Sequence, residues 1–270
     1  MKLEGVIICV DYSDFLAHSL PFNKGLFDRL VVVTDCQDEK TKWLCNYYHV
    51  ECIQTNVFYE NGDKFNKAKG INTALDKLSK DGWVMHLDAD IYLPPLTRYI
   101  LGNLPLDSKV LYGADRLMCP DYLSWIKYIE NPSKIQEAWV YIHPTAFPVG
   151  VRIAEYNNFH QGYTPIGYLQ LWNPQGSGVY KYPDIHGKAD RTDVLFAKLW
   201  TRPFRQLLPE ILCIHLESEG LTLEQMGKNW NGRKTKEFSY KSLIPIRGYK
   251  PTCLQKIKNC LTKLLNYGKK

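Results

Sequence analysis

The first third of the chain alternates between short apolar runs, which are typical of buried strands, and segments with helical periodicity. We expect strands over 5–10, 29–34, 50–54 and 83–88, and helices over 15–27, 39–48 and 66–80. Parallel strands need a long crossover connection, which is usually a helix and almost always right-handed. The order therefore predicts an α/β fold with a mostly parallel sheet covered by helices on both faces.

Acidic residues stand where these strands end. Asp11, Asp35 and Asp88 each close an apolar run, and Asp90 follows one residue after Asp88. The carboxyl ends of parallel strands meet at one edge of the sheet, and ligands of such folds bind beyond that edge. The sequence therefore predicts a ligand site there.

The pair Asp88 and Asp90 indicates what the ligand is. Side chains alternate along a strand, so both carboxylates can point the same way and repel each other unless a cation lies between them. Mg²⁺ or Mn²⁺ prefers oxygen ligands and leaves coordination positions for phosphate. The pattern favours a nucleotide-sugar enzyme; a solvated turn with capping acids is the alternative.

Composition sets broad limits. With 270 residues, 45% hydrophobic and 23% charged, the chain can form one large domain or two closely joined lobes. The net charge of +6 favours anionic ligands such as nucleoside diphosphates, nucleic acid or lipid head groups without choosing among them. The eight cysteines form no Cys-x-x-Cys pair, which argues against structural zinc and for free thiols in a reducing, cytoplasmic protein. We expect neither a signal peptide nor a membrane span.

The second half is richer in Tyr, Trp, Pro and Gly, notably over 162–168 and 173–178, and we expect it to be rich in loops. A helix is predicted over 193–200 and a buried strand over 210–216, ending near His215.

The C-terminal tail predicts a short basic amphipathic helix. Its apolar positions are Leu254, Ile257, Leu261, Leu264 and Leu265, with lysines around them. We expect it to dock on its own domain. Peripheral contact with an anionic membrane, or with nucleic acid, is the alternative.

In their order and spacing, several of these features resemble the GT-A fold glycosyltransferases, close to the family 2-like branch. They are the strand ending at Asp11, the strand ending at Asp35, the helix that begins near Lys67, the Asp88-Ala89-Asp90 motif, the segment 190–193 and the strand ending at His215. The resemblance covers about residues 5–232. It implies a Rossmann-like central sheet, with a nucleotide-sugar half over about 1–115 and an acceptor half over about 116–235 within one domain, 1–235. Residues 236–270 would form an extension.

The resemblance also implies roles. The nucleotide-sugar would contact Asp11, Tyr12, Asp35, Lys67, Asn72 and Asp88. The metal, Mn²⁺ or Mg²⁺, would be held by Asp90 and His215 together with Asp88. For Asp35, a role as N-cap of the next helix is the alternative.

Transfer with inversion needs a base that takes the proton of the acceptor hydroxyl. Asp193 is the first choice and Asp190 the second; capping of the following helix is the alternative for either, and a retaining mechanism would need no such base. Lys228 and Arg233 would stabilise the departing diphosphate. Trp172 and Asn173 would line the acceptor pocket, with core packing and a turn as their alternative.

These observations predict a metal-dependent transferase that moves a hexose from a UDP-sugar to a hydroxyl of a glycan or lipid-linked saccharide. Three alternatives remain: transfer to hydroxymethylated bases in DNA, nucleotidyl transfer and a non-catalytic binding module. Nucleotidyl transfer usually needs a glycine-rich loop, which is absent after the first strand. The sequence does not indicate the oligomeric state.

Overall fold

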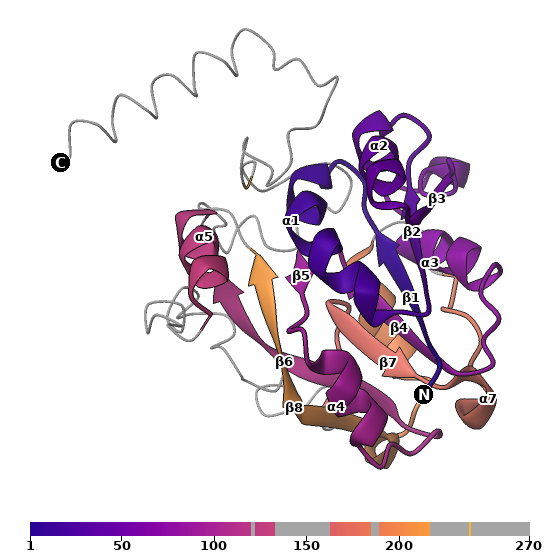
Figure 1. The fold of residues 1–270 in the computed structure, drawn as a ribbon. Coiled ribbons are helices and arrows are strands. Elements are labelled where there is room, and N and C mark those ends of the chain that lie inside the picture. Colours follow the sequence, from indigo (N-terminus) through magenta and orange to yellow (C-terminus); the bar gives the residue numbers. More distant parts are fainter. Residues whose placement is uncertain (120–121, 133–162, 185–188, 217–237, 239–270) are drawn as a thin grey trace, which may run out of the picture.

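The computed structural model describes residues 1–119, 122–132, 163–184, 189–216 and 238. Its strands form one eight-stranded sheet in the order β3-β2-β1-β4-β7-β6-β8-β5 (Figure 1). The strands are β1 (Leu3–Ile8), β2 (Arg29–Thr34), β3 (Glu51–Gln54), β4 (Trp83–Asp88), β5 (Ile91–Tyr92), β6 (Leu111–Cys119), β7 (Leu169–Trp172) and β8 (Arg205–Leu216). The helices are α1 (Ser13–Asn23), α2 (Glu39–Tyr48), α3 (Lys67–Leu75), α4 (Thr97–Asn103), α5 (Tyr122–Glu130), α7 (Pro174–Ser177) and α8 (Thr192–Ala197).

The predicted fold class is confirmed. Strands β3, β2, β1 and β4 pair in parallel, and the helices between them make the crossovers. The later strands add antiparallel pairings, because β7 runs against both β4 and β6, and β5 runs against β8. The sheet is therefore parallel in its first half and mixed in its second.

Two apolar layers sandwich the sheet. Along β1, Leu3 and Ile7 pack with residues of α1 and α2, whereas Val6 and Ile8 pack with residues of α3 and α8. This is the alternation expected of a strand buried on both faces. Helices α1 and α2 thus cover one face of the sheet, and α3 and α8 cover the other.

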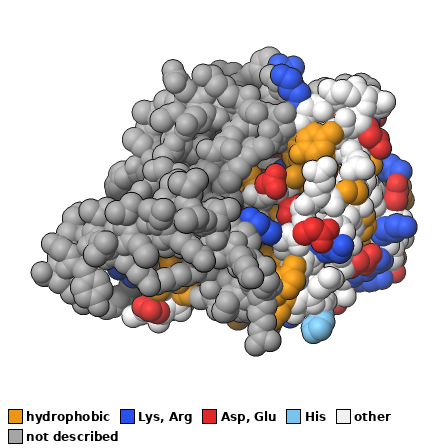
Figure 2. Space-filling model, turned by 90° about the horizontal axis from the view of Figure 1, so that it is seen from above, with side chains coloured by type: hydrophobic (Ala, Val, Ile, Leu, Met, Phe, Trp, Pro, Cys, Tyr) orange, Lys and Arg blue, Asp and Glu red, His pale blue; other side chains and the backbone are white. Residues whose placement is uncertain are grey.

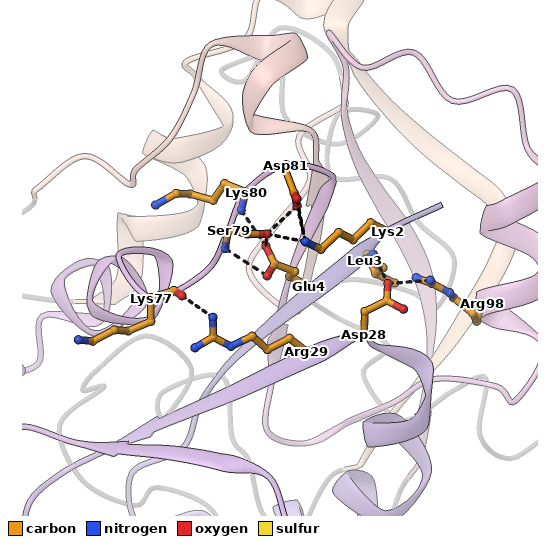
Figure 3. Close-up of polar contacts among 10 residues, drawn as sticks. All are labelled: Lys2, Leu3, Glu4, Asp28, Arg29, Lys77, Ser79, Lys80, Asp81 and Arg98. Atoms are coloured by element: carbon orange, nitrogen blue, oxygen red, sulfur yellow. Dashed lines mark hydrogen bonds and ion pairs between the residues drawn. The ribbon is translucent and has the colours of Figure 1, made fainter.

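The helix expected over 66–80 is too long and is corrected. It ends at Leu75, and the chain turns before β4, with Lys80 at a φ of 57°. The buried carboxylate of Glu4 accepts hydrogen bonds from Ser79 N (3.2 Å), Ser79 Oγ (2.9 Å) and Lys80 N (2.8 Å), as Figure 3 shows. These bonds hold the turn at the edge of the sheet opposite the predicted site.

Glu4→Ala should lower the free energy of unfolding by about 1–3 kcal/mol, because the partly buried N–H groups of Ser79 and Lys80 and the Ser79 hydroxyl lose their buried acceptor. Urea denaturation measures the change. The matched control is Asp81→Ala, which removes an exposed ion pair with Lys2 and an exposed hydrogen bond from Ser79 Oγ but leaves the bonds from the two backbone N–H groups to Glu4, and it should change stability less. Equal stability of the two variants would contradict this account of the turn.

Six cysteines lie among the described residues and are free thiols, and two of them, Cys9 and Cys213, are buried. No helix in the described part of the chain is long and apolar enough to cross a membrane. The predicted C-terminal helix lies outside the described residues.

Candidate active site

The Asp88-Ala89-Asp90 motif lies where the sequence predicts it. Asp88 is the last residue of β4 and pairs with Ile8 at the end of β1, and Asp90 comes directly before β5. Seen from the side toward which β1 and β2 point, acidic and basic side chains lie close together on the described surface (Figure 2). The two carboxylates, however, bind different partners.

Asp90 binds His215. Its Oδ2 lies 3.1 Å from His215 Nε2, and its main-chain oxygen accepts from Leu216 N at 2.8 Å. The antiparallel pairing of β5 with β8, which sets Ile91 opposite His215, brings the two residues together. Burial raises the pKa of the Asp90 carboxyl, but His215, a backbone hydrogen bond and the Arg116 guanidinium together outweigh it, and the net pKa lies below the ordinary value. Asp90 is therefore a carboxylate at neutral pH.

The second oxygen of Asp90, Oδ1, is buried and has no hydrogen-bond partner among the described residues. An unpartnered buried carboxylate oxygen is costly unless something binds it. A carboxylate oxygen beside an imidazole is a suitable donor set for Mn²⁺ or Mg²⁺. The free oxygen of Asp90 therefore fits the metal that the resemblance implies, and His215 would join it only through a ring nitrogen without a proton.

Sequence reasoning missed Arg116, which lies on the other side of His215. Arg116 Nη1 lies 2.8 Å from His215 Nδ1, and its guanidinium lies 4.5 Å from the centre of the Tyr168 ring. Because a guanidinium only donates, Nδ1 accepts in this arrangement and Nε2 carries the proton toward Asp90. To bind a metal through Nε2, His215 would have to lose this proton or move it to Nδ1 and release Arg116. The contact depends on the pairing of β6 with β8, for which the sequence carries no local signal.

Asp88 binds Lys67. Lys67 Nζ lies 2.5 Å from Asp88 Oδ1, and the N-cap Asn66 fixes the start of α3 by accepting from Lys69 N. Burial lowers the pKa of Lys67, but the carboxylates of Asp88 and Asp193 outweigh it, so its pKa lies above the ordinary value. Burial is also the largest influence on Asp88 and raises its pKa, although Lys67 opposes the shift. Lys67 is thus an ammonium held among acidic groups.

Asp193, the preferred base, lies beside the same lysine. Its Oδ2 accepts from Gly167 N at 2.7 Å and its Oδ1 from Val194 N at 2.8 Å. A Cβ at position 167 would lie 3.1 Å from Asp193 Cβ and 3.3 Å from Lys67 Nζ, so glycine permits this close approach. The structure thus brings Lys67, Asp88 and Asp193 together.

Asp190, the second candidate base, belongs to a 3₁₀ turn, Ala189–Arg191, and its side chain is not described. The N-cap residue of α8 is Arg191, without a side-chain cap.

A buried polar network, which sequence reasoning also missed, lies next to Lys67, Asp88 and Asp193. Tyr182 Oη donates to Gln170 Oε1 at 2.5 Å and lies 3.2 Å from His86 Nδ1. Gln170 Nε2 in turn donates to the main-chain oxygen of Asp193 at 3.1 Å. Burial lowers the pKa of His86 well below its ordinary value, so this imidazole is neutral. These uncharged side chains hold the main chain at Asp193 in place from the buried side.

The loops after β1 and β2 carry the predicted nucleoside contacts. Asp11 is exposed, Tyr12 stacks on Phe15, and Asp35 is partly exposed. The alternative interpretation of Asp35 as a helix N-cap is wrong, because α2 is capped by Asp38, whose carboxylate accepts from Thr41 N at 3.1 Å.

For Asn72 the structure shows a supporting role. Its Nδ2 donates to Tyr182 O at 3.0 Å, and its Oδ1 accepts from Tyr182 N at 2.8 Å. Both polar atoms are engaged by the backbone, so the predicted contact with the nucleotide-sugar is not supported.

The prediction that Trp172 and Asn173 line the acceptor pocket is wrong. Trp172 is fully buried, donates to Val179 O at 3.0 Å and packs edge-on against Phe196. Asn173 caps α7 by accepting from Gly176 N. Because β7 runs against β4, Trp172 pairs with Val84, at the far end of β4 from Asp88. Core packing and a turn are the correct interpretation.

Trp172→Ala should therefore act on stability and not on acceptor binding. We expect a loss of about 3–5 kcal/mol, as for other buried aromatic residues truncated to alanine. Chemical denaturation measures it. A variant as stable as the wild type, with a changed acceptor KM only, would contradict the assignment to the core.

The three predicted metal ligands do not converge. Asp88 turns to Lys67 while Asp90 turns to His215, and within the described residues no group of three His, Cys, Asp or Glu side chains is placed to hold a metal ion. Lys228 and Arg233 lie outside the described residues.

No protein-family model and no curated protein matches the sequence, but solved structures match the fold. Mannosyl-3-phosphoglycerate synthase from Rubrobacter xylanophilus aligns with 84% of this chain and 70% of its own, with a TM-score of 0.51 and 14% identity. The chain has a GT-A fold.

Two further GT-A structures are similar at lower scores. Glucosyl-3-phosphoglycerate synthase from Mycobacterium tuberculosis aligns over 84% of this chain and 75% of its own, at 12% identity and a TM-score of 0.47. The same enzyme in complex with Mn²⁺, UDP and phosphoglyceric acid aligns over 43% of each chain, at 16% identity and a TM-score of 0.33.

Proposed function

We propose that this chain is a metal-dependent glycosyltransferase that transfers a hexose from a UDP-sugar to an acceptor hydroxyl. The observation that carries the proposal is the buried Oδ1 of Asp90, which has no partner in the described part of the chain and lies beside His215, next to the Lys67–Asp88 pair. In a GT-A fold these groups lie at the edge of the sheet where ligands bind.

On the donor side, the exposed Asp11 and the partly exposed Tyr12 and Asp35 would receive the nucleoside, and Asp88 the ribose. The Lys67 ammonium contacts Asp88, so with the ribose on Asp88 it would lie near the diphosphate of the donor and could bind it. Asp90 and His215 would hold Mn²⁺ or Mg²⁺, which when bound offsets negative charge on the departing nucleoside diphosphate.

On the acceptor side, Asp193 would take the proton of the attacking hydroxyl. Two backbone N–H groups hold its carboxylate in place, and a positioned carboxylate is what a hydroxyl nucleophile needs. Asp190 remains the second candidate.

A saccharide of a glycan or lipid-linked oligosaccharide is the proposed acceptor. The R. xylanophilus neighbour is named for a phosphoglycerate product, so 3-phosphoglycerate belongs in the acceptor screen. For hydroxymethylated DNA, the net charge of +6 is the supporting feature. A cytoplasmic location, the domain boundaries and peripheral membrane contact stay predictions.

The first test is calorimetric titration of the full chain with UDP, with and without Mn²⁺, followed by a screen of UDP-sugars for hydrolysis. Binding of UDP that requires Mn²⁺ supports the donor site. No binding of UDP under either condition would overturn the proposal for a UDP-sugar, and GDP-sugars and duplex DNA would then be tested.

A further inference from the structure

The most extensively bonded carboxylate near the predicted nucleoside loops is that of Asp38, which is 6% exposed. Its Oδ1 accepts from Thr41 N. Its Oδ2 accepts from Asp11 N (2.9 Å), Thr34 Oγ1 (2.9 Å) and Thr41 Oγ1 (2.7 Å). One side chain thus joins the end of β2, the start of α2 and the loop that follows β1.

The bond to Asp11 matters because of the backbone there. Asp11 has a φ of 59°, in the left-handed region, which is uncommon for a residue other than glycine although Asp tolerates it better than most. A conformation of this kind persists when its surroundings stabilise it. The Asp38 carboxylate does so by accepting the Asp11 N–H at the point where the chain leaves the sheet.

Asp38 also fixes the second loop. Its own N–H donates to Asp35 O at 3.1 Å, and the Asp35 carboxylate accepts from Gln37 N at 2.9 Å. Asp11 is therefore held by the Asp38 side chain, and the main chain of Asp35 by the Asp38 N–H, while the Asp35 carboxylate is held by Gln37 N.

We propose that Asp38 is a positioning residue of the nucleotide subsite: it holds the main chain of Asp11 and of Asp35 in the arrangement that receives the nucleoside of the donor. The inference rests on the proposed function and extends it to a buried residue that would not itself touch the nucleoside. It predicts that loss of the bond from Asp11 N weakens binding of the donor nucleotide, and that an equal loss of stability elsewhere in the same cluster does not.

The test is the nearly isosteric Asp38→Asn variant. Asparagine is as good an N-cap as aspartate, so its oxygen can keep the bond from Thr41 N while its NH₂ group faces Asp11 N and can no longer accept. We expect the Kd for UDP, measured with Mn²⁺, to rise at least about tenfold. The KM for the UDP-sugar should rise in parallel with kcat nearly unchanged, because this contact acts on ground state and transition state alike.

Thr41→Val is the matched control. It removes another hydrogen bond to the same Oδ2, at a fully buried position, but leaves the bond between Asp11 and Asp38. Its thermal stability should fall as much as that of Asp38→Asn, whereas its Kd for UDP should stay within about twofold of the wild type. If Asp38→Asn does not fold, Asp38→Ser replaces it: serine caps well but is too short to reach Asp11.

The outcomes separate the two proposals. If the wild type binds UDP and Asp38→Asn binds it equally well, the positioning role is overturned and the proposed function stands. Equal loss of UDP binding in Thr41→Val, or a fall in kcat with an unchanged KM in Asp38→Asn, also overturns the positioning role. Failure of the wild type to bind UDP overturns the proposed function itself.

Discussion

Asp90→Ala is expected to abolish metal-dependent hydrolysis of the donor and transfer to the acceptor, lowering kcat/KM by roughly a thousandfold or more. The variant removes both carboxylate oxygens at once: Oδ1, which no described residue contacts, and Oδ2, which binds His215. Metal and leaving group would then lack their carboxylate anchor. Binding of UDP should lose its dependence on Mn²⁺ as well, which calorimetry measures independently of turnover.

The fold should survive this change. Asp90 lies at a strand end, and Leu216 donates to its main-chain oxygen, which alanine also has. The control is Asp76→Ala, which removes an exposed carboxylate paired with Lys181 and should keep full activity. Turnover that still responds to metal in a folded Asp90→Ala variant would refute the assignment of Asp90.

Asp193→Asn should lower kcat for transfer by about 10²–10⁴, the range that a general base contributes, while the Kd for UDP stays close to that of the wild type. Asparagine keeps the size of the side chain and one acceptor oxygen for Gly167 N or Val194 N, but it cannot take the acceptor proton. Transfer is measured at saturating UDP-sugar, and UDP binding in a separate titration.

Asp190→Asn is the comparison that decides between the two candidate bases. If Asp190→Asn loses transfer and Asp193→Asn does not, the base is Asp190. If both variants keep wild-type transfer, no inverting base resides in this segment, and the retaining mechanism becomes the interpretation to pursue.

The first four strands could be predicted because the information is local. The strand over 29–34 and the helix over 39–48 have the predicted bounds, since each apolar run or periodic segment is complete in itself. The helix at 66–80 failed because Glu4, far away in sequence, captures the backbone at Ser79 and Lys80. The periodicity of a segment does not show whether a distant residue will bind its backbone.

In the candidate site, too, the residues placed by local patterns could be predicted and those placed by long-range pairing could not. Asp88, Asp90 and His215 stand at predicted strand ends, so alternation and strand polarity suffice to place them at one edge. Arg116 escaped notice because its place beside His215 depends on the pairing of β6 with β8.

Trp172 was misassigned for a related reason. It comes just before a segment with proline and glycine, 173–178, but the direction of β7 decides which end of the sheet it occupies. Local composition does not reveal that direction.

The long separation between the two halves of the Asp90–His215 pair has a consequence for how the protein is made. His215 leaves the ribosome about 125 residues after Asp90, a delay of roughly 6–25 s at ordinary rates of synthesis. Strands β1 to β4 can pair during that interval, whereas β5 must wait for β8. We expect nascent chains to form the parallel layer of β1 to β4 first and to place the imidazole of His215 beside Asp90 only near the end of translation.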